Sequence, residues 1–139
     1  LQLAEKYKLP SVIMDFIATH HGTTKTAFFY SKYLNAGGDP ADVADFTYPG
    51  PRPTTKEQVI LMLSDTLEAA SRTLKDRTPH GISELVDRIV QGKIDEGQFN
   101  EADISLKELH TVSENLKEYI RQVYHARVVY PSGKKRKNK

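Results

Sequence analysis

The chain has 139 residues, enough for one domain with a buried core, and its lack of cysteine excludes disulfide bonds, thiolate metal sites and cysteine nucleophiles. Its net charge of +2 arises at the end of the chain: five of the 20 Lys and Arg residues lie in 134–139, "KKRKNK", and without them the balance is 15 minus 18, or −3. We therefore expect a mildly acidic domain over 1–131 that binds no nucleic acid, and a basic, disordered tail over 132–139. Contact of this tail with anionic lipid or nucleic acid is the alternative.

The first ten residues, "LQLAEKYKLP", are typical of the last turns of a helix, and no apolar run approaches the roughly 18 residues that a membrane-spanning helix needs. Because the chain begins with Leu1 rather than methionine, we expect a piece of a longer protein. Pro10 suits the first turn of a predicted helix over 10–20, and Gly22 suits its end. This helix has a one-sided apolar stripe of Val12, Ile13, Phe16 and Ile17.

A second helix is predicted over 24–34 and ends at "NAGGDP", after which Asp39 begins a short helical turn. The apolar side chains on these two segments are Phe28, Phe29, Tyr33, Val43 and Phe46, and we expect the last two to face inward. The next stretch, "TYPGPRPTTKE", contains three prolines, which exclude a helix and favour a stiff, extended loop.

The longest predicted helix covers about 55–74. Thr54 or Thr55 caps it, and Glu57 or Gln58 is placed for a capping box. Its inward stripe consists of Val59, Ile60, Leu63, Leu67, Ala70 and Leu74.

Another helix is predicted over about 81–91, and "GKIDEGQFNEADI" follows it as a polar connector. Ser105 then caps the last long helix, with Glu108 three residues further on. The inner face of the first of these helices has Ile82, Leu85, Val86 and Ile89, and that of the second has Leu106, Leu109, Val112, Leu116, Ile120 and Val123. The pattern as a whole predicts an all-α bundle.

One carboxylate interrupts the apolar pattern of the longest helix. Asp65 lies among leucines, and Glu68 and Arg72 follow it on roughly the same face. A carboxylate near an apolar surface needs a hydrogen bond, an arginine or a metal as its partner. Periodicity by itself favours a simpler arrangement, in which Glu68 pairs with Arg72 and Asp65 lies on a solvated border.

Two histidines, His20 and His21, stand side by side in "THHGTTK", where the predicted helix ends. Neutral imidazole is a common ligand of zinc, iron and manganese, and at a helix end both rings can approach one ion. The pair by itself is more typical of polar helix-end residues, and a metal site needs at least one further ligand from elsewhere in the fold.

Four segments in combination resemble a known family. They are "LPSVIMDFIATHHGTT", "FTYPGPRPTTKEQVILMLSDTLEAASRTL", "ELVDRIVQGKIDEGQFNEADISLKEL" and "YHARVVYP". Their order and spacing are similar to those in the C-terminal part of the cytoplasmic HD domain of bacterial seven-transmembrane HD phosphohydrolases. The resemblance implies an all-α HD-type bundle without the N-terminal part of that domain. It also implies a metal-dependent phosphodiesterase that hydrolyses cyclic di-AMP on the cytoplasmic side of the membrane.

The same resemblance implies a two-metal centre, with iron or manganese as the metals. His20 and His21 match the histidine pair that ligates one metal, and Asp65 matches the closing aspartate that serves the other. Glu68 and Arg72 would then orient Asp65. The family's earlier ligands, a histidine, a His-Asp dipeptide and another histidine, are absent from this chain. We therefore expect the chain alone to be inactive.

Four further residues are candidates for contact with the substrate. Thr23 and Lys25 lie within a turn of the histidine pair, where either side chain can reach a phosphate. The alternative is that Thr23 is a helix cap and Lys25 a solvated lysine. Tyr48 and Arg52 lie in the proline-rich loop, where they can bind a base and a phosphate or belong to a rigid connector. A non-catalytic helical signalling module, such as a degenerate HD domain, is the alternative function. The apolar surface that missing helices would leave open favours a homodimer.

Overall fold

The computed structural model describes residues 1–125, which are helical apart from their connections. The elements are α1 (Gln2–Lys6), α2 (Ser11–Thr19), α3 (Ala27–Asn35), the 3-10 helix η1 (Pro40–Phe46), α4 (Lys56–Ser71), α5 (Pro79–Asp95) and α6 (Leu106–His125). Within these residues the β-structure is limited to one isolated bridge, between Lys25 and Thr47. The all-α prediction is therefore confirmed, while the predicted basic tail, 132–139, lies outside the described residues.

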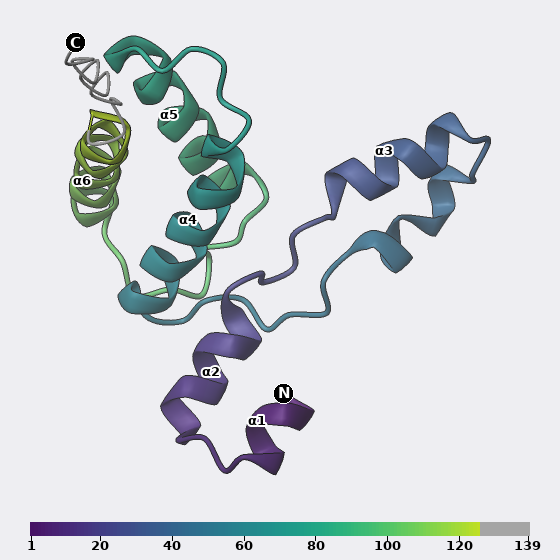
Figure 1. The fold of residues 1–139 in the computed structure, drawn as a ribbon. Helices are drawn as coiled ribbons and strands as arrows, with labels where there is room; N and C mark the ends of the chain where they lie inside the picture. The colour runs from purple at the N-terminus through teal and green to yellow at the C-terminus, as the bar shows by residue number, and fades with distance from the viewer. Residues whose placement is uncertain (126–139) are drawn as a thin grey trace, which may run out of the picture.

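Figure 1 shows a body of helices, below which α1 and α2 extend, and an arm on one side. In the body, α4, α5 and α6 pack against one another, and α2 packs against α4. In the arm, α3 packs against η1, and both project away from the body (Figure 1). Phe46 of η1 lies against the rings of Tyr30 and Tyr33, with centroid distances of 5.4 and 4.9 Å, so the arm has a small aromatic core of its own.

The main core lies between α4, α5 and α6 and is built from the stripes that the sequence predicts. Its buried members are Val59, Leu63, Leu67, Leu85, Val86, Val90 and Leu109. Two predicted members are wrong: Ile60 is 41% exposed and Leu106 is 82% exposed. Both lie in the first two turns of their helices, where neighbouring helices do not cover them.

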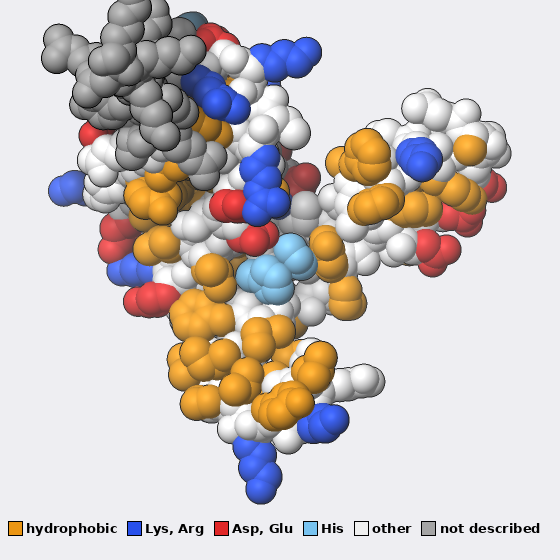
Figure 2. Space-filling view, viewed as in Figure 1, with side chains coloured by type: hydrophobic (Ala, Val, Ile, Leu, Met, Phe, Trp, Pro, Cys, Tyr) orange, Lys and Arg blue, Asp and Glu red, His pale blue; other side chains and the backbone are white. Residues whose placement is uncertain are grey.

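The predicted helix α2 forms, but its apolar stripe does not belong to the main core. Val12 and Ile13 are exposed, and so is Leu3 of α1. Figure 2 shows an apolar surface over the part of the molecule that α1 and α2 form. The helical period was therefore predictable, but in this chain Val12, Ile13 and Ile17 of the stripe are exposed and Phe16 is only partly buried.

Capping side chains determine where α4 and α5 begin. Thr55 and Gln58 form the predicted capping box, in which the Thr55 hydroxyl accepts from the Gln58 N–H and the Gln58 amide accepts from the Thr55 N–H. Thr78 caps α5 by accepting from the Gly81 N–H at 3.2 Å. As a result α5 begins at Pro79, before the predicted start, and it continues to Asp95. The prediction that 92–104 is a connector is therefore wrong for its first four residues.

The start of α6 provides a test of pH-dependent stability. Glu108 accepts hydrogen bonds from Lys56 Nζ at 2.6 Å and from the N–H and hydroxyl of Ser105 at 2.9 and 2.7 Å. The bond from Lys56, followed by those from Ser105, lowers the pKa of Glu108 from 4.5 to about 2. Because the folded-state pKa is depressed, this stabilisation is present above pH 4.5 and is lost as the pH falls towards 2.

We therefore expect Glu108→Gln to lower the melting temperature at pH 7 and to flatten its dependence on pH between about 4.5 and 2. Melting curves of the wild type and the variant should converge near pH 2. The exposed Glu101 supplies the control, since Glu101→Gln removes one carboxylate without touching the cap. Equal pH dependence in the wild type and Glu108→Gln would contradict the prediction.

Candidate metal centre

The histidine pair lies where α2 ends. α2 stops at Thr19, and Gly22 takes a left-handed conformation with φ +53°, its N–H donating to the Thr19 carbonyl at 2.9 Å. The two imidazole centroids are 3.9 Å apart. Neighbouring residues inside a helix diverge by about 100°, so this closeness depends on the turn at the helix end.

A backbone bond orients the ring of His20. Its Nδ1 lies 2.8 Å from the carbonyl oxygen of Ile17, and this oxygen can only accept. Nδ1 therefore carries the proton, which leaves the Nε2 lone pair of the neutral ring free to bind a metal. A backbone carbonyl on one imidazole nitrogen is a usual arrangement in histidines that ligate metals.

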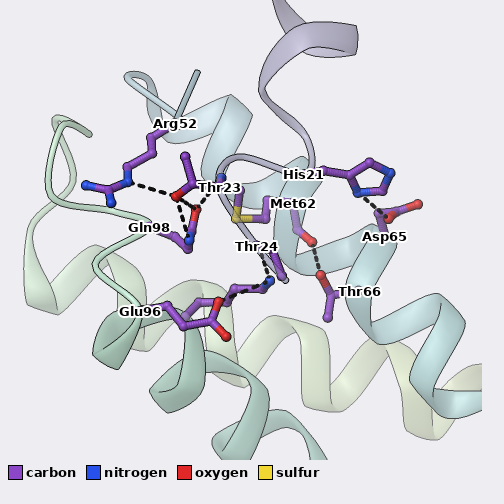
Figure 3. A network of polar contacts seen from close by, with 10 residues as sticks. His21, Thr23, Thr24, Arg52, Met62, Asp65, Thr66, Glu96 and Gln98 are labelled. Carbon is purple, nitrogen blue, oxygen red and sulfur yellow. Dashed lines mark hydrogen bonds and ion pairs between the residues drawn. The ribbon is translucent and has the colours of Figure 1, made fainter. Parts of the chain in front are cut away.

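Asp65 of α4 lies beside the pair, although 44 positions separate it from His21. Its Oδ2 is 3.9 Å from His21 Nδ1, and both side chains are partly exposed (Figure 3). The distance is longer than a hydrogen bond, so His21 Nδ1 and Asp65 Oδ2 do not occupy each other's hydrogen-bonding positions. The packing of α2 on α4 thus places Asp65 beside His21, whose ring in turn contacts that of His20. Among residues 1–125 no three His, Asp or Glu side chains meet closely enough to enclose a metal ion.

The electrostatic surroundings favour a neutral His21. Burial lowers the pKa of this imidazole, and the charges of His20 and Lys93 lower it further, while Asp65 acts in the opposite direction. A neutral imidazole is the form that binds metal ions. The local field therefore keeps His21 ready for ligation at neutral pH.

Among the candidate substrate residues, Tyr48 contacts the pair directly and Thr23 lies two positions after His21. The Tyr48 ring stacks on His21, with centroids 4.2 Å apart and an angle of 24°. Tyr48 and His21 border a pocket of about 190 Å³, together with Ile17, Gly22 and Gly50. Thr23 follows Gly22 directly, and its hydroxyl accepts from Arg52 Nε at 3.1 Å.

Lys25, Glu68 and Arg72 have partners outside the histidine pair and Asp65. Lys25 is exposed and pairs with Thr47 at the base of the arm. Arg72 Nη2 lies 2.6 Å from Glu68 Oε1, and both side chains are exposed. In the described part of the chain neither makes a hydrogen bond or ion pair with Asp65. This geometry matches the simpler arrangement that the sequence left open, a Glu68–Arg72 pair beside a partly solvated aspartate.

Two residues near the site were missed by the sequence analysis. Lys93 and Gln98 lie in the segment predicted to be a polar connector, yet they are 7% and 1% exposed. Lys93 donates to the Thr24 hydroxyl at 2.7 Å, and Gln98 bonds Thr23 (Figure 3). Lys93 could have been found from its spacing, because it continues the inner face of α5 one turn beyond Ile89 and Val90.

Known proteins share both the sequence and the fold. No family model matches the chain. The cyclic-di-AMP phosphodiesterase PgpH of Bacillus subtilis is 37% identical over 134 residues, and that of Listeria monocytogenes is 35% identical over 133. Each match covers 96% of this chain but only 19% and 18% of the relative, so the chain spans about a fifth of their length.

Solved structures agree with these sequence matches. The crystal structure of the L. monocytogenes PgpH HD domain aligns with a TM-score of 0.81 and 34% identity, over 89% of this chain and 57% of that one. The same domain in complex with cyclic-di-AMP gives the same TM-score and identity over 93% and 60%. The predicted HD-type bundle is therefore confirmed. The chain belongs to the HD-domain family represented by PgpH, and it has the fold of part of that domain.

Proposed function

We propose that this chain supplies part of the two-metal centre of a phosphodiesterase that hydrolyses cyclic di-AMP. The observation that carries the proposal is the approach of Asp65 of α4 to His21, which lies beside His20 at the end of α2. Support also comes from the relatives, which are named cyclic-di-AMP phosphodiesterases, and from a solved HD domain in complex with this nucleotide.

The residues present fit one part of a metal centre. Two imidazoles and one carboxylate provide nitrogen and oxygen donors without sulfur, which suits iron, manganese or zinc more than magnesium. Of these we propose iron or manganese, because the family resemblance implies them. In our proposal His20 and His21 hold one ion and Asp65 serves the other, while the remaining ligands come from outside this set. When bound, such a metal pair activates water at neutral pH and neutralises charge on the phosphoryl oxygens.

The neighbouring residues are proposed to bind the nucleotide. Tyr48, already stacked on His21 at the edge of the pocket, offers a ring face to an adenine. Arg52 is anchored to Thr23 through Nε, and we assign its Nη groups to a phosphate oxygen. Thr23 and the exposed Lys25 are further candidates for a phosphate, and Glu68 and Arg72 for an indirect influence on Asp65.

We further propose that the chain lies in the cytoplasmic HD domain of a membrane protein and that this protein forms a homodimer. The greater length of the relatives is compatible with further domains, and the exposed apolar side chains on α1 and α2 offer an interface. In residues 1–125 no helix combines the length and apolarity needed to cross a membrane.

The test is hydrolysis of cyclic di-AMP by a protein that contains this chain together with the rest of the HD domain, purified with manganese or iron. We expect turnover that chelation abolishes, and no measurable turnover from the 139-residue chain alone, because ligands are missing. Turnover by the chain alone, with contaminating enzymes excluded, would contradict the proposed ligand set. A metal-loaded complete domain that binds but never hydrolyses the nucleotide would instead favour the non-catalytic signalling module.

A further inference from the structure

Two polar side chains at the end of α5 are buried against the turn that follows the histidine pair. Lys93 is 7% exposed and Gln98 is 1% exposed, which places them among the most buried polar residues of the chain. An ammonium group and a primary amide both lose hydration when they are buried, so each requires hydrogen bonds in return. Neither residue has a role in the proposed reaction.

The hydrogen bonds of these side chains are made with two consecutive residues of the turn, Thr23 and Thr24, which Figure 3 labels together with Gln98. Gln98 Oε1 accepts from the Thr23 N–H at 3.0 Å, and Gln98 Nε2 donates to the Thr23 hydroxyl at 3.1 Å. Lys93 Nζ donates to the Thr24 hydroxyl at 2.7 Å. The second and third residues after His21 are thus each held by a side chain from the end of α5 or from the turn that follows it.

The geometry of the turn depends on this contact. A Cβ on Gly22, whose φ is already positive, would collide with Gln98 Oε1 and lie 2.8 Å from the methyl carbon of Met62. Gln98 is itself placed by Gly97, whose φ of +66° ends α5, and by donation of its N–H to the Lys93 carbonyl at 3.0 Å. Lys93 and Gln98 therefore contact the turn from the C-terminal end of α5 and the residues just after it, and Gly22 packs closely against Gln98.

A second buried lysine shows what is particular about Lys93. Lys117 of α6 is 9% exposed, and its Nζ lies 2.7 Å from Asp87 and 2.8 Å from Glu114, so two carboxylates neutralise it. The carboxylate beside Lys93, that of Glu96, lies at 3.9 Å, beyond hydrogen-bonding distance. The shortest polar contact of Lys93 is therefore its hydrogen bond to the Thr24 hydroxyl in the turn.

We infer that Lys93 and Gln98 are positioning residues that hold the Gly22–Thr24 turn and thereby place His20 and His21 for metal binding. The inference rests on the proposed ligand role of the pair. Groups that orient metal ligands typically change metal affinity by 10–100-fold when they are replaced. We expect a loss of that size from Lys93→Met and from Gln98→Leu.

The experiment measures the affinity of the protein containing the complete HD domain for Mn²⁺ by competition with a chelator, alongside melting of the metal-free form. Lys117→Met is the matched control for a buried lysine, and Gln91→Leu is the control for an exposed glutamine of α5 that bonds Asp95. The expected result is weaker Mn²⁺ binding in the two α5 variants and unchanged affinity in both controls, even where Lys117→Met lowers the melting temperature more. Lys93→Arg, which keeps a donor of similar reach, should regain most of the affinity.

Two failures can be told apart. If the wild-type domain binds Mn²⁺ with normal affinity and the α5 variants lose no more affinity than their controls, the positioning role is overturned and the proposed function stands. If His20→Ala and His21→Ala leave Mn²⁺ binding unchanged, the pair does not ligate the metal. In that case the proposed function fails together with this inference.

Discussion

Removing either histidine of the pair should reduce cyclic di-AMP turnover by about 100-fold or more in a protein with the complete HD domain. Replacing groups that merely orient a metal ligand lowers affinity or activity by about 10–100-fold. Loss of the ligand itself should therefore lower turnover at least as much. His20→Ala and His21→Ala should each remove one metal in preference to the other, because both rings serve a single ion. The double variant should be little worse than either single one, since one change already empties the position.

Metal stoichiometry, turnover and melting in chelator measure these effects separately. The stability of the metal-free form should fall only modestly, by about 1 kcal/mol for His21, because the ring contributes a stacking contact with Tyr48 rather than core volume. His110, an exposed histidine of α6, supplies the control. A single variant that retains two metals and full turnover would make that histidine an ordinary helix-end residue. A collapse of the melting temperature in chelator would make it structural.

Replacement of Asp65 should be comparably severe. In the complete domain, Asp65→Ala should abolish hydrolysis and lower the metal content without unfolding the protein, since the side chain is about half exposed and lies outside the core. Asp65→Asn should fail nearly as badly, because the amide keeps the shape but loses the charge that a metal ligand provides.

Metal content and turnover of both variants give the measurement, and circular dichroism verifies the fold. Asp15→Asn, at an exposed position of α2, removes a carboxylate without touching the pair. Near-normal rate and metal content in Asp65→Asn would show that Asp65 is a border residue of α4. The pairing of Glu68 with Arg72 would then be an ordinary surface pair.

Features decided within a few residues could be read from the sequence. The capping box of Thr55 and Gln58 and the stop of α2 before Gly22 depend on side chains that are neighbours in the chain. The apolar period of α4 to α6 also predicted most of the core, because one helical turn repeats every 3.6 residues wherever the helix lies. The presence of a histidine pair at a helix end was visible in the same way.

What the tertiary structure alone decided is which of these features meet. The approach of Asp65 to His21 depends on the packing of α2 against α4, and no local pattern encodes a contact across 44 residues. The burial of Lys93 and Gln98 arises because α5 runs on to Asp95 and ends against the turn after the pair, so residues typical of a solvated connector become buried donors and acceptors. Polarity predicts exposure only where nothing packs against a residue, and it is the packing of separate helices that sets burial and the arrangement of the candidate site.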